Sequence, residues 1–228
     1  MFEKVSIVVL LTAYKRDYFS DQIKSLLSQS IPPDKIIILN NGTLNLAHLK
    51  RDFGEKISFI NSELNTKFWG RFVIAKLFNT DYILILDDDI IPGNLWVANC
   101  LRLNKEKNCI VTGNGRFLDN IRGYGDNGFV DKDIKVAFGG HSWFFKKEYL
   151  KYFLTEDPIT YDTGEDITFS AICKIKAGIE TWVPAQKGET SSHKLNYSDD
   201  QYASFRQNNW DKVRTDICNH YIKLGWTL

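Results

Sequence analysis

The chain has 228 residues, of which 43% are hydrophobic, 25% charged and 14% aromatic. This composition is that of a globular protein, and it excludes disordered and collagen-like chains. Lysine and arginine number 29 against 28 aspartates and glutamates, so the net charge of +1 predicts no overall field for nucleic acid or an anionic membrane. A chain of this length favours a single domain whose core is stable without disulfides.

Cysteine usage predicts a reducing compartment. Cys100, Cys109, Cys173 and Cys218 form no C-x-x-C pair and no cluster with histidine at zinc spacing. We therefore expect free thiols and a cytoplasmic protein. The apolar run 5–11 is too short for a transmembrane span and lacks a small-residue cleavage site, so it predicts a buried strand.

In the first half of the chain, short runs of isoleucine, valine and leucine alternate with helical periodicity. This alternation is typical of a parallel sheet with helices on both faces. Strands are predicted at 5–11, 35–39, 57–60 and 82–86, one helix between an N-cap at Ser20 and Pro32-Pro33, and another at 68–78.

The pattern loosens after residue 89. We expect a helix from Pro92-Gly93 through Leu101, and a second helix that ends at Gly178. That second helix spans 165–176. Strands are predicted at 109–111, 136–138 and 142–145, a long loop at 113–128, and a polar segment from 185 that wraps over the core.

Asp87-Asp88-Asp89 follows the buried run 82–86 directly. Three carboxylates at the carboxyl end of a strand share a small space where α/β sheets bind ligands, and they repel one another unless a cation joins them. Hard oxygen ligands of this kind suit Mg²⁺ or Mn²⁺, ions that bridge diphosphates. Two alternatives stay open: a solvated turn, and the D-x-D of a haloacid-dehalogenase-type phosphatase, which normally opens its domain.

The order of several polar segments resembles that of glycosyltransferases with the GT-A fold, above all family-2-type enzymes. The resemblance covers about residues 5–183 and implies one α/β domain with a mainly parallel central sheet flanked by helices. The segments that carry it are Thr12-Ala13-Tyr14-Lys15-Arg16, Asn40-Asn41-Gly42, Asn65 with Gly70-Arg71, Asp87-Asp88-Asp89, Gly139-Gly140 and Glu165-Asp166.

The resemblance implies a division of labour along the chain. Residues 1–184 would form the catalytic core, with 1–90 as the nucleotide-binding half and 91–184 as the acceptor half, while 185–228 form the C-terminal wrap. The residues implied to bind the nucleotide sugar are Thr12, Tyr14, Arg16, Asn41, Asn65, Arg71, Asp87 and Asp88. A polar βα loop, an Asn-Gly turn and an exposed helix arginine are the structural alternatives for parts of this set.

A divalent metal, Mn²⁺ or Mg²⁺, is implied at Asp89. GT-A sites often add a downstream histidine, and His193 is placed for that role, with His141 as its rival. For the transferred sugar or the acceptor, the candidates are Gly140, whose small size permits close backbone approach, His141, and Trp143, which offers an apolar face.

Glu165-Asp166 matches the acidic pair at the start of a helix that holds the catalytic base of inverting enzymes. The segment Asp162-Thr163-Gly164-Glu165 also has the spacing of a capping box, so Glu165 has a structural alternative and Asp166 is the predicted base. A carboxylate is ionised at neutral pH and is competent for this role.

Two other patterns are weaker evidence for a function. The G-x-G-x-x-G at 123–128 follows no predicted strand and opens no helix, and Gln207-Asn208-Asn209-Trp210 lacks the arginine of the Q-x-x-R-W of processive enzymes.

The predicted function is metal-dependent transfer of one sugar from a nucleoside diphosphate sugar, first of all a UDP-sugar, to a hydroxyl of a saccharide or other acceptor, with inversion. The alternatives are a Mg²⁺-dependent phosphatase with Asp87 as nucleophile and a carbohydrate- or Ca²⁺-binding module that uses the same acids and the aromatic residues Trp143, Trp182 and Trp210, expected to be exposed.

Overall fold

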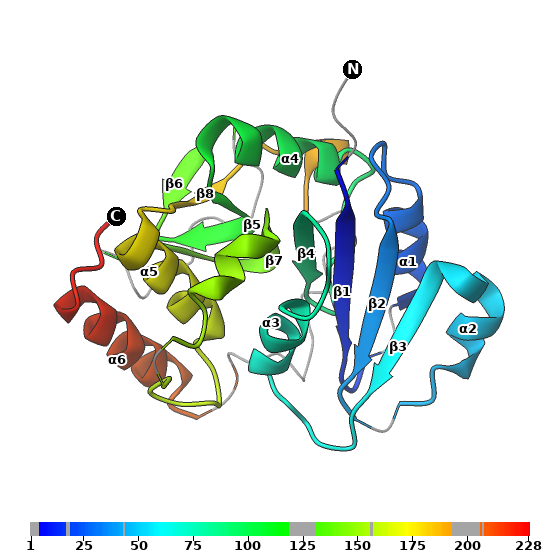
Figure 1. The fold of residues 1–228 in the computed structure, drawn as a ribbon, viewed down its shortest axis with the longest axis horizontal. Helices are drawn as coiled ribbons and strands as arrows, with labels where there is room; N and C mark the ends of the chain where they lie inside the picture. The colour runs from blue at the N-terminus through cyan, green and yellow to red at the C-terminus, as the bar shows by residue number, and fades with distance from the viewer. Residues whose placement is uncertain are drawn as a thin grey trace.

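The computed structural model of the chain describes residues 5–16, 19–42, 44–118, 131–155, 157–192, 206 and 208–228. At its centre, eight strands form one sheet in the order β3-β2-β1-β4-β7-β5-β8-β6 (Figure 1). The strands are β1 (Ile7–Ala13), β2 (Lys35–Asn40), β3 (Ile57–Asn61), β4 (Tyr82–Leu86), β5 (Ile110–Arg116), β6 (Ile134–Val136), β7 (Phe138–Lys146) and β8 (Thr181–Val183).

The first four strands make the parallel half of the sheet. β1 lies between β2 and β4, and β3 pairs with the outer side of β2. Successive side chains of β1 point to opposite faces, so Val9 packs into one core cluster and Leu10 into the other. β4 is buried along its whole length, which is why its sequence is apolar at every position.

The direction of β7 decides which residues meet at the edge of the sheet. β7 is antiparallel to β4, and Ser142 pairs with Leu86, so the first part of β7 adjoins the carboxyl end of β4. β5 is antiparallel to β7, and β8 and β6 complete the far side. One edge therefore gathers the carboxyl ends of β1, β2 and β4 with the start of β7, the position at which α/β sheets bind ligands.

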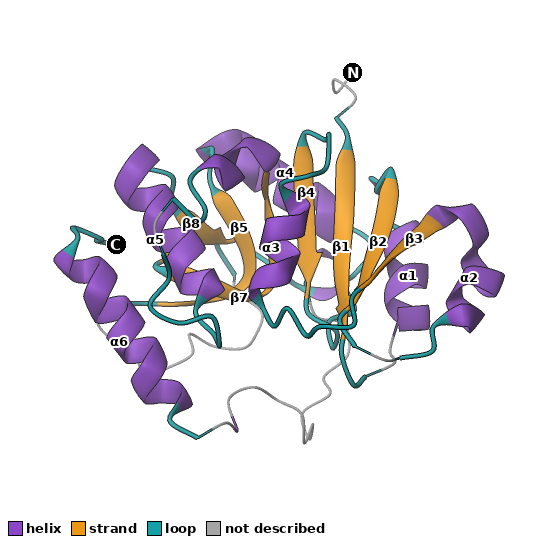
Figure 2. Ribbon diagram, turned by 60° about the horizontal axis from the view of Figure 1, so that its bottom comes forward, coloured by secondary structure: helices purple, strands orange, loops and turns teal. Residues whose placement is uncertain are grey.

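Helices cover both faces of the sheet (Figure 2). Buried side chains of α1, α2 and α4 pack against one face, and those of α3 and α5 against the other. α6 packs on α5 through Ile217, Cys218 and Tyr221. The bounds are α1 (Phe19–Leu27), α2 (Ala47–Phe53), α3 (Trp69–Ala75), α4 (Trp96–Lys107), α5 (Glu165–Ala177) and α6 (Trp210–Lys223), with short 3-10 turns at Gly54–Lys56, Lys147–Lys151 and Gly188–Thr190.

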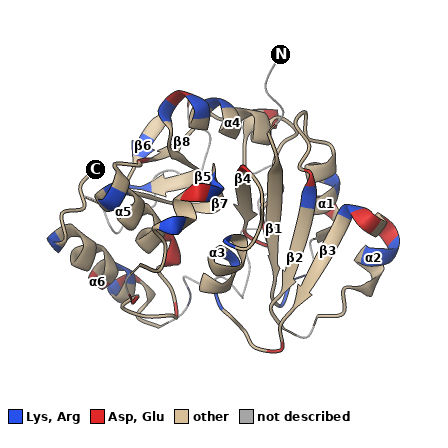
Figure 3. Cartoon of the chain, in the orientation of Figure 1, with Lys and Arg blue, Asp and Glu red and all other residues tan. Residues whose placement is uncertain are grey.

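Charged residues of both signs occur on α2, α4 and α6 (Figure 3). The surfaces of these helices therefore carry both positive and negative charges, in keeping with the net charge of +1. Within the described part of the chain, every helix is too short or too polar to cross a membrane.

The predicted fold class is confirmed, and the strands of the first half lie where the sequence places them. Helix α1 begins at Phe19, so Ser20 is its second residue and not its N-cap. Gly178, with φ of 66°, ends α5 as predicted, because only a residue without Cβ adopts this conformation easily.

Three predictions for the second half were wrong in detail. β5 extends through Gly113 to Arg116, into the predicted loop, and β7 runs without a break through Gly139 and Gly140. β6 ends at Val136, where a strand was expected to begin. The predictions missed α2, β8 and α6, and the G-x-G-x-x-G at 123–128 lies outside the described residues.

Candidate functional site

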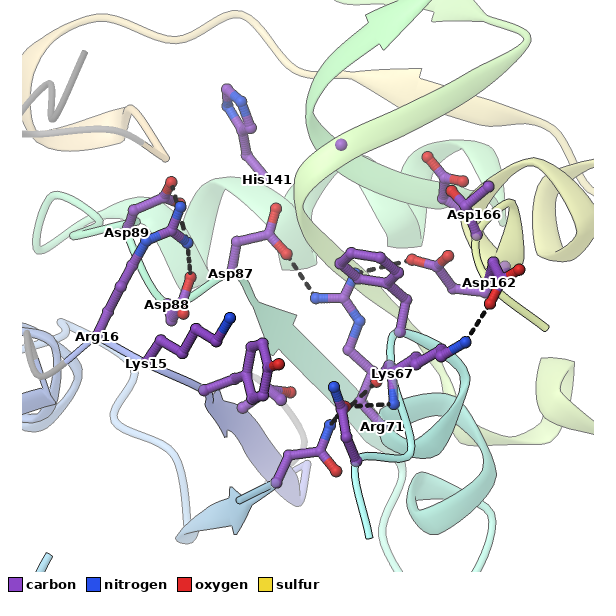
Figure 4. A pocket seen from close by; sticks show the side chains of 18 of the residues that line it. Lys15, Arg16, Lys67, Arg71, Asp87, Asp88, Asp89, His141, Asp162 and Asp166 are labelled. Carbon is purple, nitrogen blue, oxygen red and sulfur yellow. Dashed lines mark hydrogen bonds and ion pairs between the residues drawn. The ribbon is translucent and has the colours of Figure 1, made fainter. Parts of the chain in front are cut away.

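A cavity of about 580 Å³ opens at the edge of the sheet where β1, β2 and β4 end (Figure 4). Every predicted site residue that the structure describes lines it: Thr12, Tyr14, Arg16, Asn41, Asn65, Arg71, Asp87, Asp88, Asp89, Gly140, His141, Trp143, Glu165 and Asp166. His193 lies outside the described residues. The residues come from seven separate segments of the chain, and the topology of the sheet brings them together.

The backbone around the cavity is unusual in three places. Lys15, Lys67 and His141 line the cavity, and each has φ in the left-handed region, at 67°, 52° and 65°. Such conformations are uncommon for residues other than glycine, and they cluster at functional sites because the surrounding structure must hold them. These three conformations agree with the motifs in pointing to this edge of the sheet.

Arg16, at the end of the loop that follows β1, lies beside two of the three consecutive aspartates. Its Nη1 donates to Asp88 and lies 3.8 Å from Oδ2 of Asp89. Burial raises the pKa of Asp88 to about 7; Arg16 opposes this shift, and the charges of Asp89 and Asp87 add to it. The guanidinium thus offsets part of the repulsion among the three carboxylates.

Arg71, in the first turn of α3, bridges the two sides of the cavity. Its Nη1 donates to Oδ1 of Asp87, and its Nη2 donates to Oε1 of Glu165 at 2.9 Å. The guanidinium lies 4.5 Å from the centre of the Trp143 ring. Burial disfavours its charge, but the carboxylates of Asp87 and Glu165 outweigh burial and raise the pKa of Arg71. Arg71 therefore links Asp87, after β4, to Glu165, at the start of α5, through one guanidinium.

Glu165 and Asp166 open α5, and each pairs with a different arginine. Burial, together with the charge of Asp166, raises the pKa of Glu165 to about 7, although Arg71 and Arg214 lower it. Asp166 accepts two bonds from Arg214 of α6, at 3.0 and 2.7 Å. Both acids line the cavity, and Asp166 lies on the side opposite Asp88 and Asp89 (Figure 4).

The capping box that was the structural alternative for Glu165 does not form at the start of α5. The N-cap is Gly164, and it provides no side-chain cap. Asp162 pairs instead with Lys67, which also lines the cavity. The side chain of Glu165 points to Arg71, so its role in the structure is an ion pair and not a cap.

The residues predicted for the sugar lie at the start of β7. Cβ atoms on Gly139 and Gly140 would approach Thr112 Oγ1 to 1.9 Å and Asn114 Oδ1 to 2.6 Å, so these glycines allow close packing of β5. Burial lowers the pKa of His141, and Asp87 opposes this shift. His141 Nε2 lies 3.2 Å from the amide nitrogen of Asn114. Trp143 is only 2% exposed, and its ring contacts Arg71.

The polar residues after β1 and β2 form the other wall. The amide of Asn41 donates to Asn65 Oδ1 at 2.8 Å and accepts a bond from the backbone N–H of Thr66 at 2.7 Å, so it ties β2 to the loop before α3. Tyr14 is 38% exposed at the cavity mouth. Within the described part of the chain, the Thr12 hydroxyl is buried and has no hydrogen-bond partner, so a bound ligand could take it up.

The cavity is also lined by residues that were not predicted for the transferase site: Lys15, Lys67, Phe68, Asp162, Thr163, Arg206, Trp210 and Arg214. Trp210 and Arg214 lie four residues apart on α6, and a helical period there was the available signal. The tryptophans suggested for a carbohydrate-binding module are not all exposed, because Trp143 and Trp210 are buried.

The carboxylates after β4 fit a divalent ion that is shared with a ligand. Their oxygens are the donors that Mg²⁺ and Mn²⁺ prefer, and Mg²⁺ is commonly held by one or two carboxylates together with substrate phosphates. Among the described residues, no three histidine, cysteine or acidic side chains converge to enclose an ion. In this structure the Arg16 guanidinium lies beside Asp88 and Asp89.

Comparison with solved structures supports the same fold. The crystal structure of S. aureus TarS superposes with a TM-score of 0.61 at 14% identity, over 80% of this chain and 36% of that chain. TarS 1-349 in complex with UDP gives a TM-score of 0.61 at 15% identity, over 80% of this chain and 59% of that chain. The chain thus spans less than two thirds of these structures. No curated protein sequence matches it.

A family profile gives the assignment. The profile described as "Glycosyl transferase family 2" matches residues 8–164, which is more than half of the chain. The match runs from the second residue of β1 through β7 and ends one residue before Glu165. The profile, the sheet topology and the placement of the cavity agree, and the chain belongs to glycosyltransferase family 2, with the GT-A fold.

Proposed function

We propose that the protein transfers one sugar from a nucleoside diphosphate sugar to an acceptor hydroxyl, with the help of a divalent metal ion and with inversion at the anomeric carbon. One observation carries this proposal. Three consecutive carboxylates after β4 face a second acidic pair, Glu165-Asp166, across one cavity in a family 2 glycosyltransferase (Figure 4). Such a site offers separate acidic groups for the departing diphosphate and for the incoming hydroxyl.

The donor nucleotide would occupy the wall formed by the ends of β1 and β2. Thr12 and Tyr14 would contact the base, Arg16 the base or a phosphate, and Asn41 the base or the ribose, while Asn65 would reach over the nucleoside; all five line the cavity. Arg71, Asp87 and Asp88 complete this set. A UDP-sugar is the first choice, because TarS, which shares the fold, is described in complex with UDP.

The metal, Mn²⁺ or Mg²⁺, would be held by Asp89, with His193 as a second candidate ligand. The bound ion would supply charge stabilisation for the diphosphate leaving group. Arg16 lies beside Asp88 and Asp89, so we expect it to turn toward a phosphate when the donor binds. This movement would make the carboxylate oxygens available.

The acceptor would enter from the side of α5. Asp166 is the proposed base that removes the proton from the acceptor hydroxyl, and Glu165 supports it from the neighbouring position. Gly140, His141 and Trp143 would border the transferred sugar, with Trp143 acting through its contact with Arg71. A saccharide or another hydroxyl compound would serve as acceptor.

We further propose that residues 1–90 bind the nucleotide, that 91–184 shape the acceptor side, and that 185–228 belong to the same domain. The free, buried state of all four cysteines supports a cytoplasmic location. The phosphatase alternative has lost its support, because Asp87 is engaged by Arg71 and the family is one of glycosyltransferases.

Calorimetric titration of UDP, GDP and dTDP, each with and without Mn²⁺, tests the donor half. We expect UDP to bind, with an affinity that depends on the metal. Hydrolysis of UDP-sugars in the absence of an acceptor then identifies the sugar, and NMR of the product anomer tests inversion. Absence of binding by all three nucleotides would contradict the proposal, and a product that keeps the donor configuration would contradict inversion.

A further inference from the structure

The acid proposed as the base is held by a residue outside the region that the family profile matches. Asp166 begins α5, and Arg214 lies on α6, 50 residues beyond the end of the matched segment at 164. Nη1 of Arg214 bonds to Oδ1 of Asp166 at 3.0 Å, and Nη2 bonds to Oδ2 at 2.7 Å. A planar guanidinium that meets both oxygens fixes the plane of a carboxylate as well as its position.

Arg214 is itself held in place. Its guanidinium lies 5.1 Å from the ring centre of Trp210 and 5.4 Å from that of Phe138. Nη1 also lies within 3.3 Å of the Thr163 hydroxyl. The side chains of Arg214 and Asp166 are 8% and 9% exposed, so water competes little for the pair. The Arg214 side chain is already held in one conformation, so it has little conformational entropy left to lose, unlike the arginine of a surface ion pair.

The close approach of α6 to α5 is built into the backbone. A Cβ on Gly164, the N-cap of α5, would lie 2.4 Å from Cδ1 of Ile217 on α6. Gly164 also has φ of 87°, a conformation that residues with a side chain rarely adopt. The residue before the acidic pair therefore lets α6 come near enough for Arg214 to reach Asp166.

The bonds leave one acceptor position on the carboxylate. Among the described residues, its donors are the two Arg214 nitrogens and the backbone N–H of Ile167, which bonds to Oδ1 at 2.8 Å. A carboxylate has about four lone-pair sites, so Oδ1 is saturated and Oδ2 keeps one. The backbone N–H of Ile167 therefore leaves Oδ2 as the oxygen that can accept a proton in the cavity, and Arg214, which bonds to both oxygens, holds the carboxylate in that orientation.

We infer that Arg214 is a positioning residue for the glycosyl transfer: it orients the Asp166 carboxylate so that Oδ2 faces the acceptor hydroxyl. This inference rests on the proposed function, in which Asp166 is the base. It makes α6 part of the acceptor side of the site, although α6 follows the matched region. Removal of Arg214 should lower kcat and leave binding of the donor nucleotide unchanged.

The test uses hydrolysis of the UDP-sugar that the wild type cleaves fastest among UDP-glucose, UDP-galactose and UDP-N-acetylglucosamine, with Mn²⁺ present. Arg214→Lys keeps the charge but loses the fork, and we expect kcat to fall about 10-fold with KM for the donor unchanged. Arg214→Ala should lower kcat about 100-fold, and added guanidinium ion should restore part of it. Lys212→Met, on the exposed side of the same helix, is the matched control and should leave both constants unchanged.

Combination with Asp166→Asn separates positioning from general support of the fold. If Arg214 acts through Asp166, Arg214→Lys has no further effect on kcat in the Asp166→Asn protein. Additive losses, or an Arg214→Lys enzyme as fast as the wild type, would overturn the inference while the proposed function stands. A wild type that binds no nucleotide and releases no sugar would remove the proposed function, and this inference with it. If Arg214→Ala does not fold, the lysine variant and its combination with Asp166→Asn decide the question.

Discussion

The two acidic groups of the cavity lie in contrasting environments. Asp87 and Asp89, after β4, have side chains that are each 29% exposed and Asp88 is 14% exposed, whereas Glu165 and Asp166, at the start of α5, are 4% and 9% exposed. Exposed carboxylates can exchange one cation for another at little cost, whereas buried carboxylates need a fixed partner. The first group is therefore suited to a metal that arrives with the donor, and the second to a permanent arrangement.

The largest expected effect comes from removing the arginine that joins the two groups. Arg71→Met leaves Asp87 and the buried Glu165 without their guanidinium, and we expect the free energy of unfolding to fall by about 3 to 5 kcal/mol. Arg16→Met should cost less, because its partners Asp88 and Asp89 are 14% and 29% exposed and water can replace part of the lost interaction, whereas Glu165 is 4% exposed. Urea denaturation of both variants at neutral pH measures the difference. Equal losses would refute the contrast between the two groups.

The second prediction concerns pH. Burial and the charge of Asp166 raise the pKa of Glu165 from 4.5 to about 7 in the folded protein. Arg71 and Arg214 oppose this shift, and Arg71 also interacts with Asp87. Between these values the folded state holds a proton that the unfolded state has lost, so stability falls as pH rises through this window, by up to about 3 kcal/mol, and is level above it.

Urea denaturation of the metal-free protein across this window measures the slope. Glu165→Gln cannot titrate, and we expect its profile to lose this fall while the contributions of other groups persist. Identical slopes for the wild type and Glu165→Gln would show that Glu165 is not the group responsible.

The smallest expected effect lies at the exposed group. Asp89→Ala should weaken UDP binding in the presence of Mn²⁺ by about 10- to 100-fold, and should leave both metal-free binding and the melting temperature near their wild-type values. Calorimetry with and without Mn²⁺ gives the comparison. Unchanged Mn²⁺-dependent affinity would refute the role of Asp89 as a ligand.

The sequence predicted the cavity lining better than it predicted the contacts within it. Tyr14, Asn41 and Asp87 each follow a strand of the parallel half, and parallel strands bring their carboxyl ends to one edge. The motif order was therefore sufficient to place them together. It could not show that Arg71 is a buried brace, because Arg71 reaches Glu165 across 94 residues of the chain.

The same limit explains the errors around α5 and α6. A capping box is a local pattern, and the spacing at residues 162–165 satisfied it, but Asp162 is drawn to Lys67, 95 residues away. α6 buries Ile217, Cys218 and Tyr221 against α5, and its other face is polar. The spacing of apolar residues along α6 is therefore only weakly helical when the sequence is taken alone.

By itself, the sequence determined the α/β class, the parallel half of the sheet and the set of polar residues at its carboxyl edge, because periodicity and strand-end motifs are local properties. Only the tertiary structure decided which arginine pairs with which acid, that Trp143 lies under Arg71, and that α6 reaches Asp166. The physical reason is that ion pairs and ring contacts depend on the packing of segments far apart in the chain, and their energies depend on how completely that packing excludes water.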